Sequence, residues 1–321
     1  LYAPSSLFGA LLATMALSDF ILLRSEREDV CAAALLDAVA QALGQEAPLC
    51  AVSPAWKHGG ELLGRCDPLT KIYEETAFLQ TIYEAGWAKE LRFAALDRVT
   101  AAKPEVYLAP LLPVFQLFGA GEDALRGVPL APSQWPTDPR LLRGGFLPWP
   151  QNLWLFGLLE PTDPKPSPML RAAAAEFCLP AQNARSFLVP WTQPLQVESA
   201  QLRRLFDHAE EVFTLPQESA LRLVQLLHYL AERLQLALPP QTQERFARFF
   251  SVCLACGMTA REAFDAFLFH HALRPLENAD PAVLRYELPG LRVFLAQLAG
   301  QRALPLTAAL LEGLVDGMGR K

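Results

Sequence analysis

The stretch DFILLRSEREDVCAAALLDAVAQALGQEAPLCAVS, residues 19–53, decides the fold of the N-terminal part. It opens with the apolar run 19–24, which is typical of a strand, and Ser25-x-x-Glu28 then has the form of a helix-starting capping box. The predicted helix ends at Gly44, and the apolar run 48–53 predicts a second, buried strand. A strand–helix–strand order favours two parallel strands, and we predict an α/β or α+β fold with a small mixed sheet for the N-terminal part.

The rest of the first 195 residues alternates between strand and helix signals. Asp67-Pro68 predicts a helix start, because aspartate is a good N-cap and proline a good first helical residue. Between Pro104 and Pro194 the chain holds 16 of its 27 prolines and four of its six tryptophans. Proline removes a ladder hydrogen bond, so we expect edges, turns and short strands here. The strand candidates beyond residue 53 are 91–96, 105–109, 153–159 and 185–189.

The chain after Gln196 has helical periodicity to its end. One predicted helix buries the stripe that contains Leu221, Val224 and Leu227, and Thr259-x-x-Glu262 is a second capping box. Two further helices are expected to begin at Pro289 and Pro305. We therefore predict two domains: an α/β domain over 1–195, with the proline-rich segment 104–194, and an all-α helical bundle over 196–321.

Composition excludes several classes of protein. With 52% hydrophobic and 19% charged residues the chain is not intrinsically disordered, and a net charge of −6 with no basic stripe argues against nucleic-acid binding. The six cysteines lie mostly in apolar company, which indicates reduced thiols and a cytoplasmic location. The apolar run from Leu7 to Leu23 is interrupted by Asp19, so we predict neither a signal peptide nor a membrane span.

Two glycine-rich segments have the spacing of nucleotide-binding loops. Gly119-Ala-Gly121 matches a dinucleotide motif, but Glu122 and Asp123 follow it, and a tight turn is the better interpretation. Gly59 to Cys66 has P-loop spacing, with arginine in place of the lysine and cysteine in place of the magnesium-binding hydroxyl. We therefore predict no cofactor and no nucleotide hydrolysis at these motifs.

No catalytic or metal-binding set emerges from the remaining motifs. Cys253-x-x-Cys256 lies in an apolar helix without a second ligand pair, and His271 is expected to be a hydrogen-bonded core residue. His58, beside two glycines in a loop, is the one histidine that we would test for chemistry. We predict no catalytic residue and no metal ligand.

The proline-rich segment concentrates aromatic side chains. Protein interfaces are enriched in tryptophan and phenylalanine, and stiff loops lose less entropy on binding, which favours a protein-binding surface here. The alternative is that these tryptophans cover the core. The candidate partner-binding residues are Trp135, Phe146, Trp149, Trp154 and Trp191.

Residues 199–275 resemble a known family. The order of Ser199-Ala-Gln-Leu-Arg-Arg-Leu205, Phe246-Ala-Arg-Phe-Phe250 and then Gly257-Met-Thr259-Ala-Arg-Glu262 is similar to the C-terminal helical region of bacterial type VI secretion effector adaptors. The resemblance implies a non-enzymatic cytoplasmic chaperone that binds a secreted effector and a spike component. The alternative is an α/β enzyme or small-ligand-binding protein, with a pocket at the carboxyl ends of the N-terminal strands, near 53–60 or 118–121.

Overall fold

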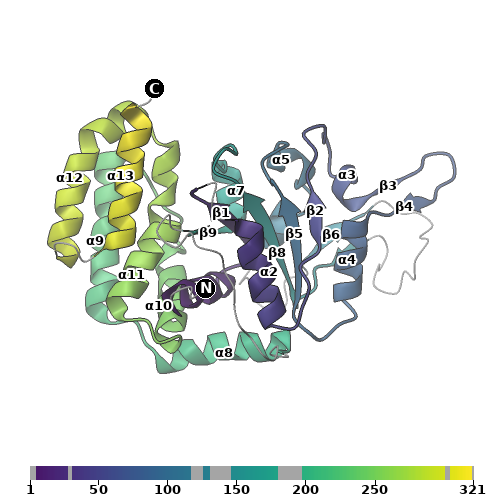
Figure 1. Cartoon of the computed structure of the whole chain (residues 1–321), viewed down its shortest axis with the longest axis horizontal. Coiled ribbons are helices and arrows are strands. Elements are labelled where there is room, and N and C mark those ends of the chain that lie inside the picture. Colours follow the sequence, from purple (N-terminus) through teal and green to yellow (C-terminus); the bar gives the residue numbers. More distant parts are fainter. Residues whose placement is uncertain are drawn as a thin grey trace. The chain divides into compact units, whose positions relative to one another are not determined.

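The structure, a computed structural model of the chain, describes residues 5–27, 31–116, 126–130, 146–179, 197–300 and 304–319. The described part divides into two compact units, one of residues 18–204 and one of residues 5–17 with 205–319. The division therefore falls inside helix α8 (Ser199–Val212), whereas the sequence-based boundary lies at 195/196. The first helix, α1 (Ser5–Met15), belongs to the second unit (Figure 1).

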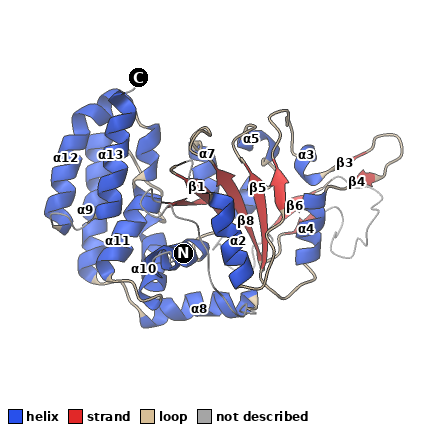
Figure 2. Ribbon diagram, in the orientation of Figure 1, coloured by secondary structure: helices blue, strands red, loops and turns tan. Residues whose placement is uncertain are grey.

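The first unit is built around a five-stranded sheet with the strand order β2-β5-β8-β1-β9. All four strand pairings in it are parallel, which confirms the α/β fold class predicted for the N-terminal part. Figure 2 shows the strands of this sheet with helices α2 and α4 beside them. The sheet strands are β1 (Phe20–Ser25), β2 (Leu49–Ala51), β5 (Arg92–Asp97), β8 (Leu153–Leu159) and β9 (Ala175–Leu179). The other elements of this unit are α2 (Ala32–Ala42), α3 (Gly60–Leu63), β3 (Arg65–Cys66), β4 (Tyr73–Glu74), α4 (Ala77–Ala85), α5 (Pro104–Tyr107), α6 (Leu112–Gln116), β6 (Gly127–Pro129), β7 (Phe146–Pro148) and α7 (Pro168–Ala173).

The strand predictions hold best in the centre of the sheet. The runs 19–24, 91–96 and 153–159 form β1, β5 and β8, and every residue of β8 is buried. A parallel strand covered on both faces needs such a continuous apolar run. At the sheet edge the prediction is less accurate: β2 is only three residues long, and Leu49 is 54% exposed instead of buried.

Two further strand predictions have different outcomes. The candidate 105–109 is wrong, because Pro104 starts the short helix α5 at its first turn. The candidate 185–189 lies outside the described residues. The capping box predicted at Ser25 is wrong, because Ser25 is the last residue of β1 and the N-cap of α2 is Cys31. The end of the first helix is confirmed: α2 stops at Ala42, and Gly44 follows with a φ of +65°.

The helix predicted from Asp67-Pro68 is wrong, because this segment turns between the strands of a hairpin. Strands β3 and β4 pair antiparallel, with Cys66 opposite Tyr73. The Asp67 carboxylate accepts hydrogen bonds from the backbone N–H groups of Leu69 (2.7 Å) and Thr70 (3.2 Å), which closes the turn. An Asp-Pro pair begins turns as readily as helices, and only the β3–β4 pairing decides between them here. Helix α4 begins instead after Thr76, whose hydroxyl accepts from the Leu79 N–H.

Asp19, which interrupts the apolar N-terminal run, is a buried ion-pair partner. Its carboxylate lies 2.7 Å from the Arg126 guanidinium and 2.8 Å from that of Arg203, and its side chain has no exposed surface. A buried carboxylate needs such partners to offset the loss of hydration. The charge thus joins the start of β1 to two segments more than a hundred residues away.

The second unit is helical, as predicted for the C-terminal part. It contains the N-terminal α1, which packs against α10 and α11. Gly9 allows this close packing, since a Cβ added there would lie 3.0 Å from the Cβ of Cys256 and from the Sδ of Met258. Within the described residues, no helix is both long and apolar enough to cross a membrane. The helices that follow α8 are α9 (Gln217–Leu234), α10 (Thr242–Ala255), α11 (Ala260–Phe267), the π-helix Leu268–Ala272, the 3₁₀-helix Arg274–Asn278, α12 (Pro281–Ala299) and α13 (Pro305–Gly319).

Helix starts in this unit are predicted unevenly. The Thr259 capping box is confirmed: its hydroxyl accepts from the Glu262 N–H, and the Glu262 carboxylate accepts from the Thr259 N–H. The start at Pro305 is also confirmed. The start at Pro289 is wrong, because α12 begins at Pro281 and Pro289 lies inside it. Proline is tolerated there at the expense of one backbone hydrogen bond.

The buried face of α9 differs from the predicted one. Leu221 and Val224 are 56% and 42% exposed, whereas Leu223, Leu226 and Leu230 are buried. Both sets have helical spacing, so periodicity alone does not distinguish them. The packing of α9 against α10 and α12 buries one set and exposes the other.

Candidate ligand-binding site

A pocket lies at the carboxyl edge of the parallel sheet. Parallel strands end at one edge, and ligands of open α/β sheets bind just beyond it. The pocket has a volume of about 550 Å³, within the range typical of small-molecule sites. It is formed by three segments, which follow β2, β5 and β8, and Figure 1 shows α5 and α7 beyond the same edge. Its lining residues are Pro54, Trp56, Lys57, Thr100, Ala101, Ala102, Lys103, Pro104, Glu105, Val106, Pro164, Lys165 and Ser167.

Positive charge predominates in this pocket. Each of the three segments contributes one lysine, namely Lys57, Lys103 and Lys165, and Glu105 is the single acidic residue of the lining. This local excess contrasts with the net charge of −6 of the whole chain. A cluster of ammonium groups in a concave site favours an anionic ligand.

The Glu105 carboxylate already has a partner in the pocket wall. The Ser167 hydroxyl donates a hydrogen bond to it and accepts one of 3.2 Å from the Leu170 N–H, so Ser167 is also the N-cap of α7. This contact joins α5 to α7 across the pocket. This hydrogen bond holds the Glu105 side chain against the start of α7, and the three lysines outnumber this one carboxylate in the lining.

Thr100 brings a buried polar group to the same wall. Its side chain is 8% exposed, and its Oγ1 has no hydrogen-bond partner among the described residues. A buried hydroxyl without a partner is unfavourable by about 1–3 kcal/mol. Such groups are rare in folded proteins, and because the Oγ1 atom has almost no accessible surface, it lies behind the pocket wall and is not offered to a ligand.

A second, acidic cluster lies at the carboxyl ends of β5 and β8. Arg98 Nε and Nη2 donate to Asp163 Oδ1 at 3.1 and 3.0 Å, and the Glu160 N–H donates to Asp163 Oδ2 at 2.9 Å. Burial, and then the negative charges of Asp163 and Asp97, raise the pKa of Glu160. The ionised form of Glu160 is therefore disfavoured in the folded protein.

This shift makes Glu160→Gln a stability test. Because the folded pKa is raised above 4.5, the folded protein binds more protons than the unfolded chain from about 4.5 up to the folded pKa. The wild type should lose stability as the pH rises through that window. Glutamine does not titrate, so the Glu160→Gln variant does not lose stability in this way. Its melting temperature, measured by calorimetry, should be higher than that of the wild type at pH 7 and equal to it at pH 3. An equal change in melting temperature at pH 7 and at pH 3 would contradict a raised pKa of Glu160 as the cause.

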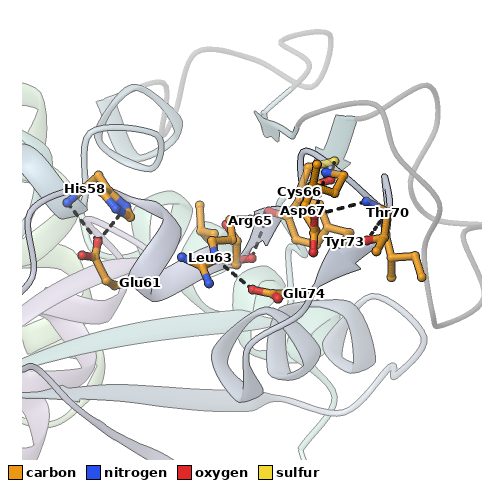
Figure 3. Close-up of polar contacts among 12 residues, drawn as sticks. His58, Glu61, Leu63, Arg65, Cys66, Asp67, Thr70, Tyr73 and Glu74 are labelled. Carbon is orange, nitrogen blue, oxygen red and sulfur yellow. Dashed lines mark hydrogen bonds and ion pairs between the residues drawn. The ribbon is translucent and has the colours of Figure 1, made fainter.

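His58, the histidine selected from the sequence, lies beside the pocket segment. Figure 3 shows it next to Glu61, with its Nδ1 2.8 Å from the Glu61 Oε2. The backbone N–H groups of Lys57 and His58 also donate to this carboxylate. Desolvation acts to raise the pKa of Glu61, but these backbone hydrogen bonds prevail and lower it. The His58 ring is 63% exposed, so the arrangement closes the loop before α3 and does not enclose a reacting group.

The P-loop-like segment from Gly59 to Cys66 forms the short helix α3 and then β3, the first strand of the β3–β4 hairpin. Gly64 has a φ of +92°, and a Cβ there would lie 2.2 Å from the Glu74 carbonyl oxygen. Arg65 pairs with Glu74 at 2.8 Å, as Figure 3 shows, and so faces the hairpin. The glycine and the arginine are both accounted for by the hairpin, and the segment does not form a phosphate-binding loop.

The candidate partner-binding aromatics are only partly within the described structure. Trp149 is 4% exposed and Trp154 is fully buried, so both belong to the core and neither presents a surface. Trp149 packs edge-on against Phe115, at 4.9 Å between ring centroids. This corrects their proposed role, because apolar aromatics next to strands fill the sheet's faces first. Phe146, in β7, is half-buried, and Trp135, Trp191 and the Gly119 motif lie outside the described residues.

The other predicted residues agree with a structural role. Cys253 is buried in α10, where desolvation raises its pKa well above the usual value. Burial, and then the charge of Arg245, lower the pKa of His271, whose Nε2 lies 3.4 Å from Thr14 Oγ1. Within the described ranges, no three His, Cys, Asp or Glu side chains come together to hold a metal ion.

Sequence reasoning anticipated the position of the pocket but not its residues. A pocket near 53–60 is one of the two places expected for a small-ligand-binding protein, and Pro54, Trp56 and Lys57 line it. The lysines were missed, although each follows a predicted strand by a few residues. That shared position was the available signal, because the ends of parallel strands converge.

Comparison with known proteins supports the fold. No family model and no curated protein matches the sequence. Among solved structures, the chain is similar to that of a putative ATPase from Cytophaga hutchinsonii, with a TM-score of 0.52 and 10% sequence identity. The similarity covers 82% of this chain and 79% of that one. At this identity it shows a shared fold.

This similarity contradicts the prediction of a non-enzymatic adaptor. That prediction depended on residues 199–275, whereas the shared fold covers 82% of the chain and is that of a protein named as an enzyme. The alternative, an α/β enzyme or small-ligand-binding protein with a site at the strand carboxyl ends, agrees better with the fold and with the pocket. No finding bears on the family resemblance itself or on a protein partner.

Proposed function

We propose that this α/β protein binds a small phosphorylated ligand, of the class that includes nucleotides, in the pocket beyond β2, β5 and β8. The observation that carries the proposal is the convergence of Lys57, Lys103 and Lys165 on one pocket of about 550 Å³. Lysine is a common phosphate ligand in proteins, and its charge is attracted to each phosphate oxygen without a fixed geometry.

The fold supports the same class of ligand. The similar Cytophaga protein is named as an ATPase, and ATP is a polyphosphate. Its name says nothing about where a phosphate would bind in this chain. That position follows from the charges that this chain itself offers.

The turn after β1 does not suit a phosphate. In P-loop proteins, a glycine-rich loop with a lysine joins such a strand to the following helix. Here β1 ends at Ser25 and α2 begins at Ala32, and the segment 26–31 (EREDVC) has three acidic residues, no glycine and no lysine. Acidic side chains repel phosphate, so the lysine-lined pocket is the favoured site.

The double variant Lys57→Ala/Lys103→Ala tests this proposal. Removing a charged hydrogen-bond partner costs about 1.5–3 kcal/mol, so the double variant should weaken ADP and pyrophosphate binding by about 100-fold or more. Isothermal titration calorimetry measures the affinities, and higher salt should reduce wild-type binding. Lys89→Ala, which removes an exposed lysine of the same unit, is the matched control and should bind as the wild type does. Absence of wild-type binding, or equal affinities in all three proteins, would refute the proposal.

A further inference from the structure

The pocket holds one aromatic side chain among its lining residues, that of Trp56. The indole is half-buried, so part of its surface is covered by the protein and part faces the pocket. Tryptophan offers a large flat surface at low entropic cost, because it has only two side-chain torsions. Planar rings bind such surfaces by stacking.

The protein holds this indole in place from behind. Tyr107 packs edge-on against it, with 5.3 Å between ring centroids and 71° between planes. Tyr107 is itself fully buried, and its hydroxyl donates a 2.7 Å hydrogen bond to the Val99 carbonyl oxygen. The backbone N–H of Trp56 donates to the Ser53 carbonyl oxygen at 3.0 Å. The ring is therefore positioned before any ligand arrives, which reduces the entropy lost on binding.

The other lining residues provide a suitable environment for a ring. They combine small or stiff apolar side chains with the lysines, so the pocket offers both an apolar and a cationic part. The apolar members are Pro54, Ala101, Ala102, Pro104, Val106 and Pro164.

From this arrangement we infer that Trp56 is the specificity-determining residue of the pocket and stacks on a planar aromatic ring of the ligand, while the lysines bind its phosphates. The inference rests on the proposed function and narrows it. Ligands that carry both phosphates and an aromatic ring should bind more tightly than phosphates without a ring. Stacking on an aromatic side chain contributes about 1–3 kcal/mol per base, which corresponds to about 5- to 150-fold in affinity.

The experiment compares ADP with pyrophosphate, which shares the two phosphates and lacks the ring. Titration calorimetry should find that the wild type binds ADP at least about 5-fold more tightly than pyrophosphate. Trp56→Ala should remove this preference and leave pyrophosphate binding within about twofold, whereas Trp56→Phe should retain much of the preference. Trp56→Leu, which keeps apolar volume without an aromatic face, replaces the alanine variant if thermal unfolding shows that the latter is not folded.

The outcomes separate this inference from the proposed function. Trp87→Ala, which removes a half-exposed tryptophan of the same unit, is the control and should keep the wild-type preference. If the wild type binds both ligands equally, or if Trp56→Ala weakens both to the same extent, the lysine pocket stands and the stacking role is wrong. If the wild type binds neither ligand, the proposed function and this inference are both wrong.

Discussion

Trp154→Ala is expected to lower the free energy of unfolding of the first unit by about 3–5 kcal/mol, a typical loss for a buried tryptophan or phenylalanine. Trp154 is fully buried in β8, opposite Phe93 of β5, and the Arg203 guanidinium lies 4.4 Å from the centre of its ring. The substitution leaves a large cavity in the central strand and exposes a charge to it. Urea unfolding followed by circular dichroism measures the loss.

Two variants distinguish packing from other effects of this change. Trp154→Phe keeps most of the ring volume and should lose less than the alanine variant. Trp87 is 51% exposed, so Trp87→Ala should change stability by about 1 kcal/mol or less. A Trp154→Ala protein as stable as Trp87→Ala would contradict the buried position of this ring and support a surface role for it.

Arg274→Met should destabilise the second unit by about 3–5 kcal/mol, because it removes the guanidinium that pairs with the buried Glu277 carboxylate. Arg274 and Glu277 are 1% and 4% exposed, with 3.0 Å between Nη1 and Oε1. Arg274 Nε also donates to the Phe269 carbonyl oxygen at 2.7 Å, and its guanidinium lies 4.2 Å from the centre of the Phe269 ring. Thermal unfolding of the wild type and the variant measures this loss.

The double variant Arg274→Met/Glu277→Gln separates the ion pair from packing. Once the buried charge at position 277 is also removed, much of the lost stability should return. A double variant whose loss equals the sum of the two single losses would show that the two charges do not interact. Arg248→Met is the control, since its ion pairs with Asp207 and Glu210 are partly exposed and should contribute little.

The predictions that depend on a short stretch of sequence were correct, and those that depend on contacts with distant residues were less accurate. Strand β8 was predicted with its observed bounds, because its apolar run is continuous and both faces of the sheet are covered. The Thr259 capping box was also predicted correctly, since its hydrogen bonds join residues only three apart. Signals that depend on distant contacts were less reliable: Asp67-Pro68 forms a turn because β3 pairs with β4, and α9 buries Leu223 instead of Leu221 because of its neighbours.

The candidate site shows the same division. The βαβ pattern of 19–53 predicted two parallel strands, and the alternative function placed a pocket at the strand ends; the sheet was predicted to be mixed, whereas the five-stranded sheet is purely parallel. The sequence did not indicate that Lys57, Lys103 and Lys165, each in a different loop, would line one pocket. The expected pocket near 53–60 included Trp56 without singling it out, and a core position for the tryptophans was one of the two interpretations left open, which the burial of Trp149 and Trp154 supports.

The sequence by itself therefore determined the α/β start and the helical end, and its alternative interpretation named the edge of the sheet at which the pocket lies. These depend on periodicity, capping and the parallel order of strands, all of which are local properties. The tertiary structure alone decided which residues form the pocket, because its lining combines loops that lie more than a hundred residues apart in the sequence, from Pro54 to Ser167. Only the tertiary structure also shows that α1 belongs to the helical unit, where Gly9 lets this helix pack closely against Cys256 and Met258.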